Sequence, residues 1–358
     1  MTHLRNNNFE HLRNKAFELG FSSFAVAGIQ LPDRYAAKYR AWLDGHYNGT
    51  MDYLNTHLPL KKNPRLLVEN AMNVICVSFL YRCEDPLPND PDHGYFSLYA
   101  RGRDYHKVIK QKLNRLAEEI QTIATDCSLR VFVDSGPVFE KYYAHEAGLG
   151  GTGRNSLVIS NTCGSFIFLG EIITNLPLPI TGKTDFDPCK SCERCISICP
   201  TGAIMDNRQL NANLCIAYLT IEYKGIIPHA LAARMGNHVY GCDECQLCCP
   251  WNRKKRYSQE PDFKCRYTAD FTKLENLLKL GESDFLRTFE GSPIRRIGYE
   301  SFLRNTIIAA GNSANTQYLP VLEDIATRTQ SETVRQHTVW AMEDLNRNKT
   351  KVCSQTDK

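Results

Sequence analysis

The order of apolar and polar positions predicts a mixture of helices and strands over roughly the first half of the chain. Apolar residues recur at helical spacing between residues 8 and 19, and Gly20 is suited to end that helix. Residues 74 to 80 form an unbroken apolar run, which is typical of a strand buried on both faces. Further expected elements are strands at 24–27, 130–133, 156–160 and 165–173, and helices at 33–58, 107–126 and 138–147. Strands mixed with helices in this order predict an α/β or α+β first domain.

From about residue 283 the pattern changes to helices in pairs. Residues 301–310, 318–326 and 331–345 each place apolar side chains at helical spacing. These segments resemble one or two HEAT-type repeats, which are too few to form a solenoid alone. We therefore expect them to pack against the rest of the chain.

Composition and charge narrow the class of protein. The 358 residues are 42% hydrophobic and 23% charged, as in an ordinary globular protein. No 18 apolar residues run together, and the first 21 residues contain neither a signal-length apolar core nor a twin arginine, so no membrane span or export is expected. Fifteen cysteines in such a chain indicate metal binding in a reducing cytoplasm. The net charge of +4 permits a polyanionic partner without requiring one.

A cysteine-rich stretch lies between the two patterns. Its first part carries Cys189, Cys192, Cys195 and Cys199 in the spacing C-x-x-C-x-x-C-x-x-x-C, followed by Pro200. This run is the bacterial ferredoxin signature for 4Fe-4S clusters, in which the fourth cysteine binds the other cluster. Thiolates are the ligands that iron in a sulfide cage requires.

The second part of the stretch carries Cys242, Cys245, Cys248 and Cys249, again followed by a proline. Counting back from that proline makes Cys249 the better match for the cross-over ligand. One cluster is therefore assigned to Cys189, Cys192, Cys195 and Cys249, and the other to Cys199, Cys242 and Cys245. The second set is one ligand short, and on spacing alone either Cys215 or Cys248 completes it.

Zinc sites and disulfides are the alternative interpretations of these cysteines. Zinc favours closed sets of C-x-x-C pairs and does not explain a proline after each run. Disulfides require an oxidising compartment. Two 4Fe-4S clusters are therefore predicted, in an α+β protein with a mixed N-terminal domain at 1–180, a ferredoxin-like double-cluster module at 181–260 and a helical HEAT-like region at 261–358.

Two further motifs are weaker. Glycines at 148, 150, 151 and 153 approximate a dinucleotide-binding loop, but a helix precedes the run and a strand follows it, which is the reverse of the required order. A loop whose backbone closely approaches a large ligand is the better interpretation. Residues 253–256 form a cation run that is either a solvated loop or a phosphate contact, and Arg295, Arg296 and Arg304 add cations near the C-terminal helices.

Several segments occur together in one order: the two cysteine runs, Cys215-Ile-Ala-Tyr-Leu-Thr-Ile, Val133-Asp134-Ser-Gly-Pro, Gly-Arg-Asp-Tyr105-His106-Lys and the helical tail. This set closely resembles the bacterial epoxyqueuosine reductases over nearly the whole chain. The resemblance implies a cobalamin-dependent enzyme that reduces epoxyqueuosine to queuosine at the wobble position of a tRNA anticodon, with base-off cobalamin against one cluster. It also favours Cys215 as the eighth ligand, since the family usually has an apolar residue where Cys248 stands.

The implied reaction needs two electrons and two protons and releases water. A 4Fe-4S cluster delivers single electrons at low potential, and cobalamin can gather them at one cobalt. The leaving oxygen must be protonated, and a carboxylic acid with a raised pKa is suited to do so. Asp134 matches the family's proposed general acid; on spacing alone it reads as a turn-forming aspartate. Asp104-Tyr105-His106 lacks the final glycine of the D-x-H-x-x-G motif, which agrees with a base-off cofactor.

The remaining site predictions come from matching segments to the family. Tyr105 and His106 are expected in the pocket of Asp134. Cobalamin contacts are expected from Lys62, Asp134, Asn155, Val158, Leu169, Ala217 and Asp243, although Ala217 replaces a serine common in the family. Phosphate contacts to tRNA are expected from Arg101, Arg103, Arg253, Lys254, Lys255, Arg256, Arg295 and Arg296. The expected protein is a cytoplasmic monomer that takes electrons from a low-potential donor of the flavodoxin or ferredoxin type.

Three other functions compete with this one. A reductive dehalogenase uses the same cofactor pair, but usually carries a twin-arginine signal. A plain electron-transfer protein would need neither a mixed domain of some 180 residues before the clusters nor an acid at position 134. A reductive activator of a corrinoid protein would bind a protein partner and no tRNA.

Overall fold

The computed structural model describes residues 2–254 and 256–356. Its N-terminal part is built on a four-stranded sheet in the order β1-β2-β7-β4, in which every neighbouring pair is antiparallel. The strands are β1 (Ser23–Gly28), β2 (Asn73–Leu80), β7 (Ile167–Thr174) and β4 (Leu129–Phe132). An antiparallel sheet with helices beside it confirms the predicted α+β class.

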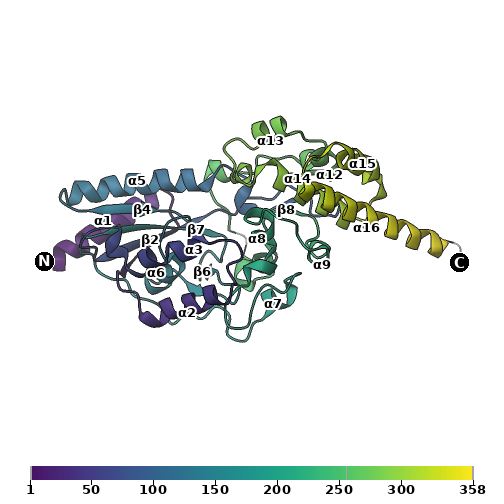
Figure 1. Ribbon diagram of the computed structural model, residues 1–358. Coiled ribbons are helices and arrows are strands. Elements are labelled where there is room, and N and C mark those ends of the chain that lie inside the picture. Colours follow the sequence, from purple (N-terminus) through teal and green to yellow (C-terminus); the bar gives the residue numbers. More distant parts are fainter. Residues whose placement is uncertain (1, 255, 357–358) are drawn as a thin grey trace.

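Helices cover both faces of this sheet, which explains the unbroken apolar run in β2 (Figure 1). On one face, α1 (Thr2–Glu18) and α5 (Tyr105–Ile123) pack against a core that includes Ile75 and Val77. On the other face, Val74 and Cys76 are buried beneath α6 and three further helices. These four helices are α2 (Asp33–Asp44), α3 (Tyr53–Thr56), α4 (Leu58–Lys62) and α6 (Glu140–Glu146).

The glycine run after α6 forms a short hairpin between β5 (Gly151–Thr152) and β6 (Val158–Ile159). A side chain at Gly150 would collide with the carbonyl oxygen of Ile159, and one at Gly151 with that of Phe186. The glycines are therefore needed for close packing of the protein's own backbone; an approach of this loop to a ligand stays a prediction. The strand expected at 156–160 is reduced to the two residues of β6.

The cysteine-rich stretch is tied to the N-terminal part by a parallel pair of strands, β3 (Tyr95–Phe96) and β8 (His238–Tyr240). The stretch itself consists mainly of loops and very short helices. The helices are α7 (Arg194–Ile198), α8 (Ile216–Ile221), α9 (His229–Ala232) and α10 (Glu244–Leu247). Short helices separated by loops let cysteines from distant positions face the same space.

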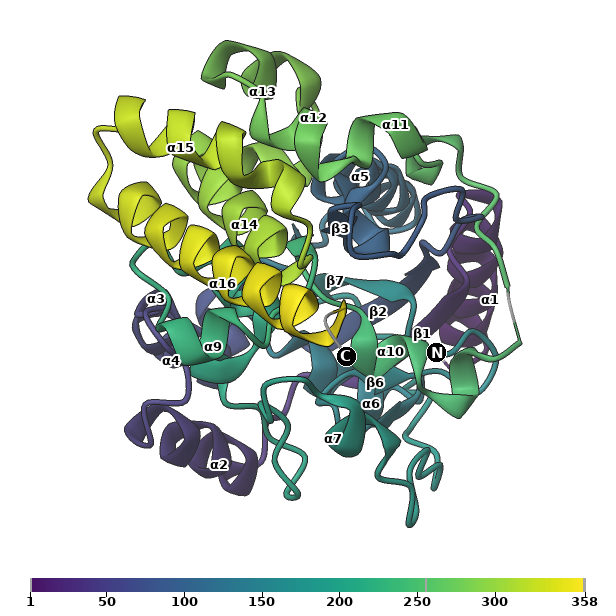
Figure 2. The same ribbon diagram turned by 90° about the vertical axis from the view of Figure 1, so that its right-hand side faces the viewer.

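The C-terminal helices pack on the cysteine-rich stretch, as expected for a region too small to stand alone. Helix α14 contacts β8, α8 and α16, and α15 packs on α16 (Figure 2). The helices are α11 (Ala269–Thr272), α12 (Leu274–Leu278), α13 (Glu282–Thr288), α14 (Gly298–Asn312), α15 (Leu319–Arg328) and α16 (Glu332–Thr356). Among the described residues, no helix combines the length and the apolar character needed to cross a membrane.

Arg304 in α14 is an internal residue and not the surface cation that the sequence suggested. Its side chain is fully buried, and its guanidinium donates to the carbonyl oxygens of Leu219 at 2.7 Å and of Tyr223 and Gly225 at 2.9 Å. A buried charge is tolerated when its donors are satisfied in this way. Arg304 therefore fixes α14 to the segment that follows α8.

Candidate redox active site

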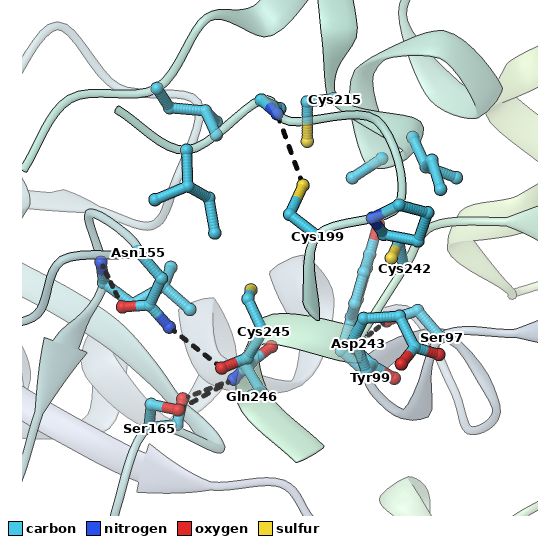
Figure 3. Close-up of a pocket in the computed structure, with 18 of the residues that line it drawn as sticks. Ser97, Tyr99, Asn155, Ser165, Cys199, Cys215, Cys242, Asp243, Cys245 and Gln246 are labelled. Atoms are coloured by element: carbon cyan, nitrogen blue, oxygen red, sulfur yellow. Dashed lines mark hydrogen bonds between the residues drawn. The ribbon is translucent and has the colours of Figure 1, made fainter. Parts of the chain in front are cut away.

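Four cysteines from separate segments line one cavity of about 310 Å³, between the sheet and the cysteine-rich stretch. They are Cys199 after α7, Cys215 before α8, and Cys242 and Cys245 around the start of α10. Figure 3 shows their sulfur atoms directed toward a common space. The structure thus brings Cys215 to the three cysteines that lacked a fourth partner.

A second group of four lines a smaller cavity nearby, of about 20 Å³. Its lining includes Cys189, Cys192, Cys195 and Cys249, the set that the spacing predicted, and also Cys245, which lines both cavities. Cys248 lies beside this second group, where its thiol donates to the carbonyl oxygen of Cys245 at 3.6 Å and senses the charges of Cys195 and Cys249. Of the two candidates that spacing left open, Cys215 lines the cavity together with Cys199, Cys242 and Cys245, and Cys248 is not among its lining residues.

The environment of the cysteines suits clusters. Burial raises the pKa of the Cys242 and Cys245 thiols, so thiolates at these positions need nearby positive charge, which bound iron supplies. Backbone N–H groups donate to sulfur, from Arg154 to Cys189 and from Ala203 to Cys199, both at 3.3 Å. Such N–H···S bonds tune cluster potentials.

Disulfides and a site for a single metal ion are the alternatives to clusters for these cysteines. All cysteines that the structure describes are free thiols. In the same described ranges, no three side chains of His, Cys, Asp or Glu converge as ligands of one metal ion would. A cubane does not need that convergence, because each thiolate binds its own iron.

Asp134 faces a neighbouring cavity of about 140 Å³ that shares Tyr105, Leu157 and Phe168 with the thiol-lined cavity. It follows β4 with a φ of 55°, a left-handed conformation that non-glycine residues rarely adopt. Its carboxylate accepts a hydrogen bond from the Tyr105 hydroxyl and lies 3.1 Å from His106 Nε2. Although protein surrounds it, the side chain is 58% exposed, because it faces the cavity.

The pKa of Asp134 differs from the expectation of a raised value. Burial by itself raises it, but the hydrogen bonds from His106 and Tyr105 and the charge of His106 outweigh burial, so the pKa lies below its ordinary value. For His106, burial lowers the pKa, while the hydrogen bonds to Asp104 and Asp134 raise it above its ordinary value. The shared proton therefore resides on the imidazole, and Asp134 and His106 act as one acid unit.

Two charged residues contact Nδ1 of His106: Asp104, the N-cap residue of the same helix, raises the pKa of the imidazole, and Arg296, from a distant segment, lowers it. Asp104 caps α5 by accepting from the backbone N–H of His106 at 3.1 Å, and its carboxylate lies 2.9 Å from Nδ1. Arg296, which precedes α14, places Nη2 2.9 Å from the same nitrogen. The sequence predicted a phosphate contact for Arg296; in the structure, its guanidinium lies beside His106 of the acid site.

The expected cobalamin contacts fall into three sets. Asn155, Ala217 and Asp243 line the thiol-lined cavity, whereas Val158 and Leu169 line the cavity of Asp134. Asp243 is also a structural clamp, since its buried carboxylate accepts from the hydroxyl of Tyr95 at 2.8 Å and from that of Ser97, labelled in Figure 3, at 2.6 Å. Lys62 is exposed at the end of α4 and is not among the residues that line either cavity.

The expected tRNA contacts also separate. Arg101 is a correction: its side chain is 5% exposed, pairs with Asp85 and donates to the carbonyl oxygen of Phe96 at 2.7 Å, so it cannot reach a phosphate. Arg103 is exposed, 3.5 Å from Asp262. Arg253, Lys254, Arg256, Arg295 and Arg296 are exposed, and Lys255 lies outside the described residues.

Sequence reasoning missed two acidic residues beside Asp134. Glu140 begins α6 and lines the same cavity as Asp134, and Glu171 lies fully buried in the middle of β7. A signal for Glu171 was present, because it is a lone charge inside the apolar run 166–173. Glu140 gave no such signal, because its position at the cavity depends on tertiary packing.

Comparisons with known proteins agree with this architecture. The family model "Epoxyqueuosine reductase QueG, DUF1730" matches residues 61–135, and the model of the 4Fe-4S double cluster binding domain matches residues 188–252. An epoxyqueuosine reductase of Pseudomonas aeruginosa is 42% identical over 336 residues, which cover 91% of each chain. This chain belongs to the epoxyqueuosine reductase family. It is therefore an oxidoreductase with a double 4Fe-4S domain, and the dehalogenase, electron-carrier and activator alternatives are set aside.

Solved structures of epoxyqueuosine reductases have the same fold. One, a crystal structure with a tRNA-Tyr stem loop modified with epoxyqueuosine, superposes with a TM-score of 0.86 at 27% identity, covering 94% of this chain and 89% of that one. Another, from Bacillus subtilis, has its catalytic loop swung out of the active site and gives a TM-score of 0.85 at 26% identity, covering 94% and 90%.

Proposed function

We propose that this protein reduces epoxyqueuosine in tRNA to queuosine, the last step of queuosine biosynthesis. The observation that carries the proposal is the junction of two cavities, one lined by four thiols and the other by the Tyr105–Asp134–His106 acid unit. Removing an epoxide oxygen as water requires electrons and protons at one place. The thiol-lined cavity is suited to supply the electrons, and the adjoining cavity of Asp134 is suited to supply the protons.

The two cysteine groups are the proposed cluster ligands. Cys189, Cys192, Cys195 and Cys249 would hold the outer cluster, and Cys199, Cys215, Cys242 and Cys245 the inner one. Four thiols in each group match the demand of a 4Fe-4S cluster. The inner group faces the cavity that adjoins Asp134, so electrons would leave the protein's redox chain there.

Cobalamin is the proposed occupant of the thiol-lined cavity. Its walls are largely apolar, from Leu157, Ile167, Phe168 and Ala217, with Asn155 as a polar wall residue that donates toward the carbonyl oxygen of Cys245. An apolar cavity with a few convergent polar groups fits a large planar cofactor. Bound there, cobalamin would supply a metal centre that collects electrons and reacts with the epoxide.

The protein's own residues would manage the proton. His106 Nε2 holds it 3.1 Å from Asp134 Oδ2, and the Tyr105 hydroxyl fixes the orientation of that carboxylate. Stacking of Tyr105 on Phe168, at 4.0 Å between centroids, keeps the hydroxyl in place. Asp134 would pass the proton to the leaving oxygen, and His106 would return one to Asp134.

Proposed tRNA contacts follow from the exposed cations. Arg296 lies at the acid site, and the exposed Arg295 and Arg103 are the sequence neighbours of Arg296 and Asp104. Arg253, Lys254 and Arg256 are also exposed and follow Trp251, whose indole donates to the carbonyl oxygen of Pro188, next to Cys189. The family member with a bound stem loop supports tRNA as the substrate here. We also propose the division into residues 1–180 for catalysis, 181–260 for electron transfer and 261–358 for helical support.

The outer cysteine group is the proposed entry point for electrons. The apolar side chains of Ile198, Leu247 and Trp251 are exposed around it, beside the cations Lys190 and Arg194. A cationic rim with an apolar centre suits an acidic, low-potential donor of the flavodoxin or ferredoxin type. Because the substrate is a tRNA, we propose that the protein works in the cytoplasm, as a monomer.

The test is anaerobic turnover with tRNA that carries epoxyqueuosine. The protein is reconstituted with iron, sulfide and cobalamin, given a low-potential reductant, and the digested nucleosides are weighed by mass spectrometry. We expect the loss of one oxygen mass only when cobalamin is present, and its disappearance in Asp134→Asn. An unchanged nucleoside, with clusters and cobalamin demonstrably bound, would refute the tRNA assignment and direct the search to small molecules or corrinoid proteins.

A further inference from the structure

A pair of acidic side chains lies directly behind Asp134. Glu140 is the first residue of α6 and faces the same cavity as Asp134. Glu171 lies on β7 and pairs with Phe132 of β4. Phe132 is two residues before Asp134, so Glu171 lies beside the end of the strand that leads into the Asp134 turn. Helix α6, the turn after β4 and strand β7 thus bring three carboxyl groups together, from Asp134 at the cavity surface to the fully buried Glu171.

The burial of this pair favours one bound proton. Both carboxylate oxygens of Glu171 and Oε1 of Glu140 are buried without a donor in the described part of the chain. Two ionised carboxylates are acceptors only and cannot bond each other. The two carboxyl groups are close enough to shift each other's pKa, and a proton on one of them would allow a hydrogen bond between them. An unprotonated pair would leave two buried charges in contact, which is the costly arrangement.

The surroundings agree with that protonation. The groups that face the pair are Asp134 from the turn after β4, Lys61 from α4, Lys141 from α6 and Cys76 from β2. Burial, together with the charge of Asp134, raises the pKa of Glu140 to about 8, and burial raises the pKa of Glu171 well above its ordinary value. Lys61 is buried as well, 5.4 Å from the ring of Phe139, and its own pKa is lowered by burial, so it only partly offsets the carboxyl groups.

The reaction of the proposed function needs this second proton. Both carbon–oxygen bonds of the epoxide break, a carbon–carbon double bond forms, two electrons arrive from the low-potential donor through the clusters, and the oxygen leaves with two protons as water. The Asp134–His106 unit holds one transferable proton. A second must follow before the oxygen can leave as water.

We propose that Glu140, backed by Glu171, is the internal reservoir of that second proton and recharges Asp134 across the cavity they share. The inference rests on the proposed function. Glu140 lies close enough to the backbone N–H of Asp134 for that group to lower the pKa of Glu140, so the reservoir adjoins the turn it serves. Lys141, which faces the same cavity and interacts with both Glu140 and Asp134, balances the charge that remains on Glu140 after transfer.

The first test does not depend on turnover. Infrared difference spectra of the reconstituted protein are recorded between about pH 6 and about pH 9.5, a range beyond the titration of ordinary carboxyl groups. We expect a protonated-carboxyl C=O band at neutral pH that titrates near 8 and shifts in D₂O. Glu140→Gln should remove that titration, whereas Glu118→Gln, on the exposed face of α5, should keep it. A wild-type protein without such a band would overturn the reservoir.

The second test is turnover of the same variants. Glu140→Gln should lower kcat by about 100-fold, the scale of one general-acid contribution, with the KM for tRNA within about twofold of wild type. Glu140→Asp, which restores a titratable group, should recover part of the rate. Glu118→Gln should match wild type. Equal clusters by absorbance in all variants will show that each has folded.

The outcomes separate the two proposals. If Glu140→Gln keeps the wild-type kcat and pH profile while the carboxyl band is lost, the pair is structural and the reservoir is refuted, although the proposed function stands. If wild type and Glu118→Gln both leave epoxyqueuosine unchanged, the proposed function fails, and the reservoir fails with it.

Discussion

The thiol-lined cavity and the acid-lined cavity share a wall but are built in different ways. Three of the four cysteines in the outer group come from one run of seven residues, and the inner group draws on three segments within a stretch of 47 residues, Cys199 to Cys245. The acid site instead joins Asp104, Asp134, Glu171 and Arg296, from four elements spread along the chain. Soft-metal sites can be encoded by local spacing, whereas a tuned proton site depends on which elements pack together.

The largest expected effect concerns the choice between two cysteines. Cys215→Ser should remove the inner cluster, halving the bound iron and sulfide and abolishing turnover, because a buried three-thiolate set cannot hold the cluster at low potential. Iron and sulfide analysis with EPR of the reduced protein measures this. Cys248→Ser is the matched control and should keep both clusters. The reverse result would exchange the roles of these two cysteines.

A loss of about 10²- to 10⁴-fold is expected for Asp134→Asn, the range of a general acid, with both clusters retained. Single-turnover rates measured against cluster absorbance test it. Turnover of the Asp134→Asn variant at the wild-type rate would show that the thiol side of the junction supplies everything the reaction needs.

The acid unit also predicts a pH dependence. Because the pKa of His106 is raised, activity should be complete at low pH and fall as pH rises through that raised pKa. His106→Gln should be slower by about 10-fold and should lose this step. The contribution of His106 to the free energy of unfolding is likewise lost as pH rises through its raised pKa. The contribution of Asp134 is lost in the other direction, because the ion pair weakens when pH falls through the lowered pKa of Asp134. A wild-type rate that instead increases through this range would contradict the assignment of the proton to His106.

The smallest effects are expected for substitutions of Arg101 and Arg103, which are two residues apart but differ in burial. Arg101→Ala should destabilise the fold by about 2–4 kcal/mol, because it leaves the Phe96 carbonyl without its donor, with little change in tRNA affinity. Arg103→Ala should leave the melting temperature unchanged, weaken tRNA binding a few-fold and reduce the salt slope by about one. Thermal unfolding and binding at several salt concentrations separate these. Equal effects on tRNA would mean that Arg101 leaves its buried position.

Much of the fold was predictable because its signals are local. The unbroken apolar run of β2, the helical spacing of α1 and the cysteine spacing each predict what the chain forms. Cys215 and Cys248 could not be separated by spacing, because the answer depends on where α8 lies. Arg101 and Arg304 were misread as surface cations, since nothing in a sequence says which carbonyl groups will surround a guanidinium. The lowered pKa of Asp134 depends on His106, which Arg296 contacts from a distant segment.

The parallel pairing of β3 with β8 has a consequence for when, during its synthesis, the protein can take up iron and sulfide. Residues 95 and 238 must meet before the inner cysteine group is enclosed, and Cys249 must be present before the outer group is complete. A ribosome therefore has to release more than two thirds of the chain before either cluster has all of its ligands. The machinery that delivers iron and sulfide therefore meets a polypeptide that is more than two thirds complete. A chain truncated before residue 242 should lack both clusters and be left to the cell's quality control.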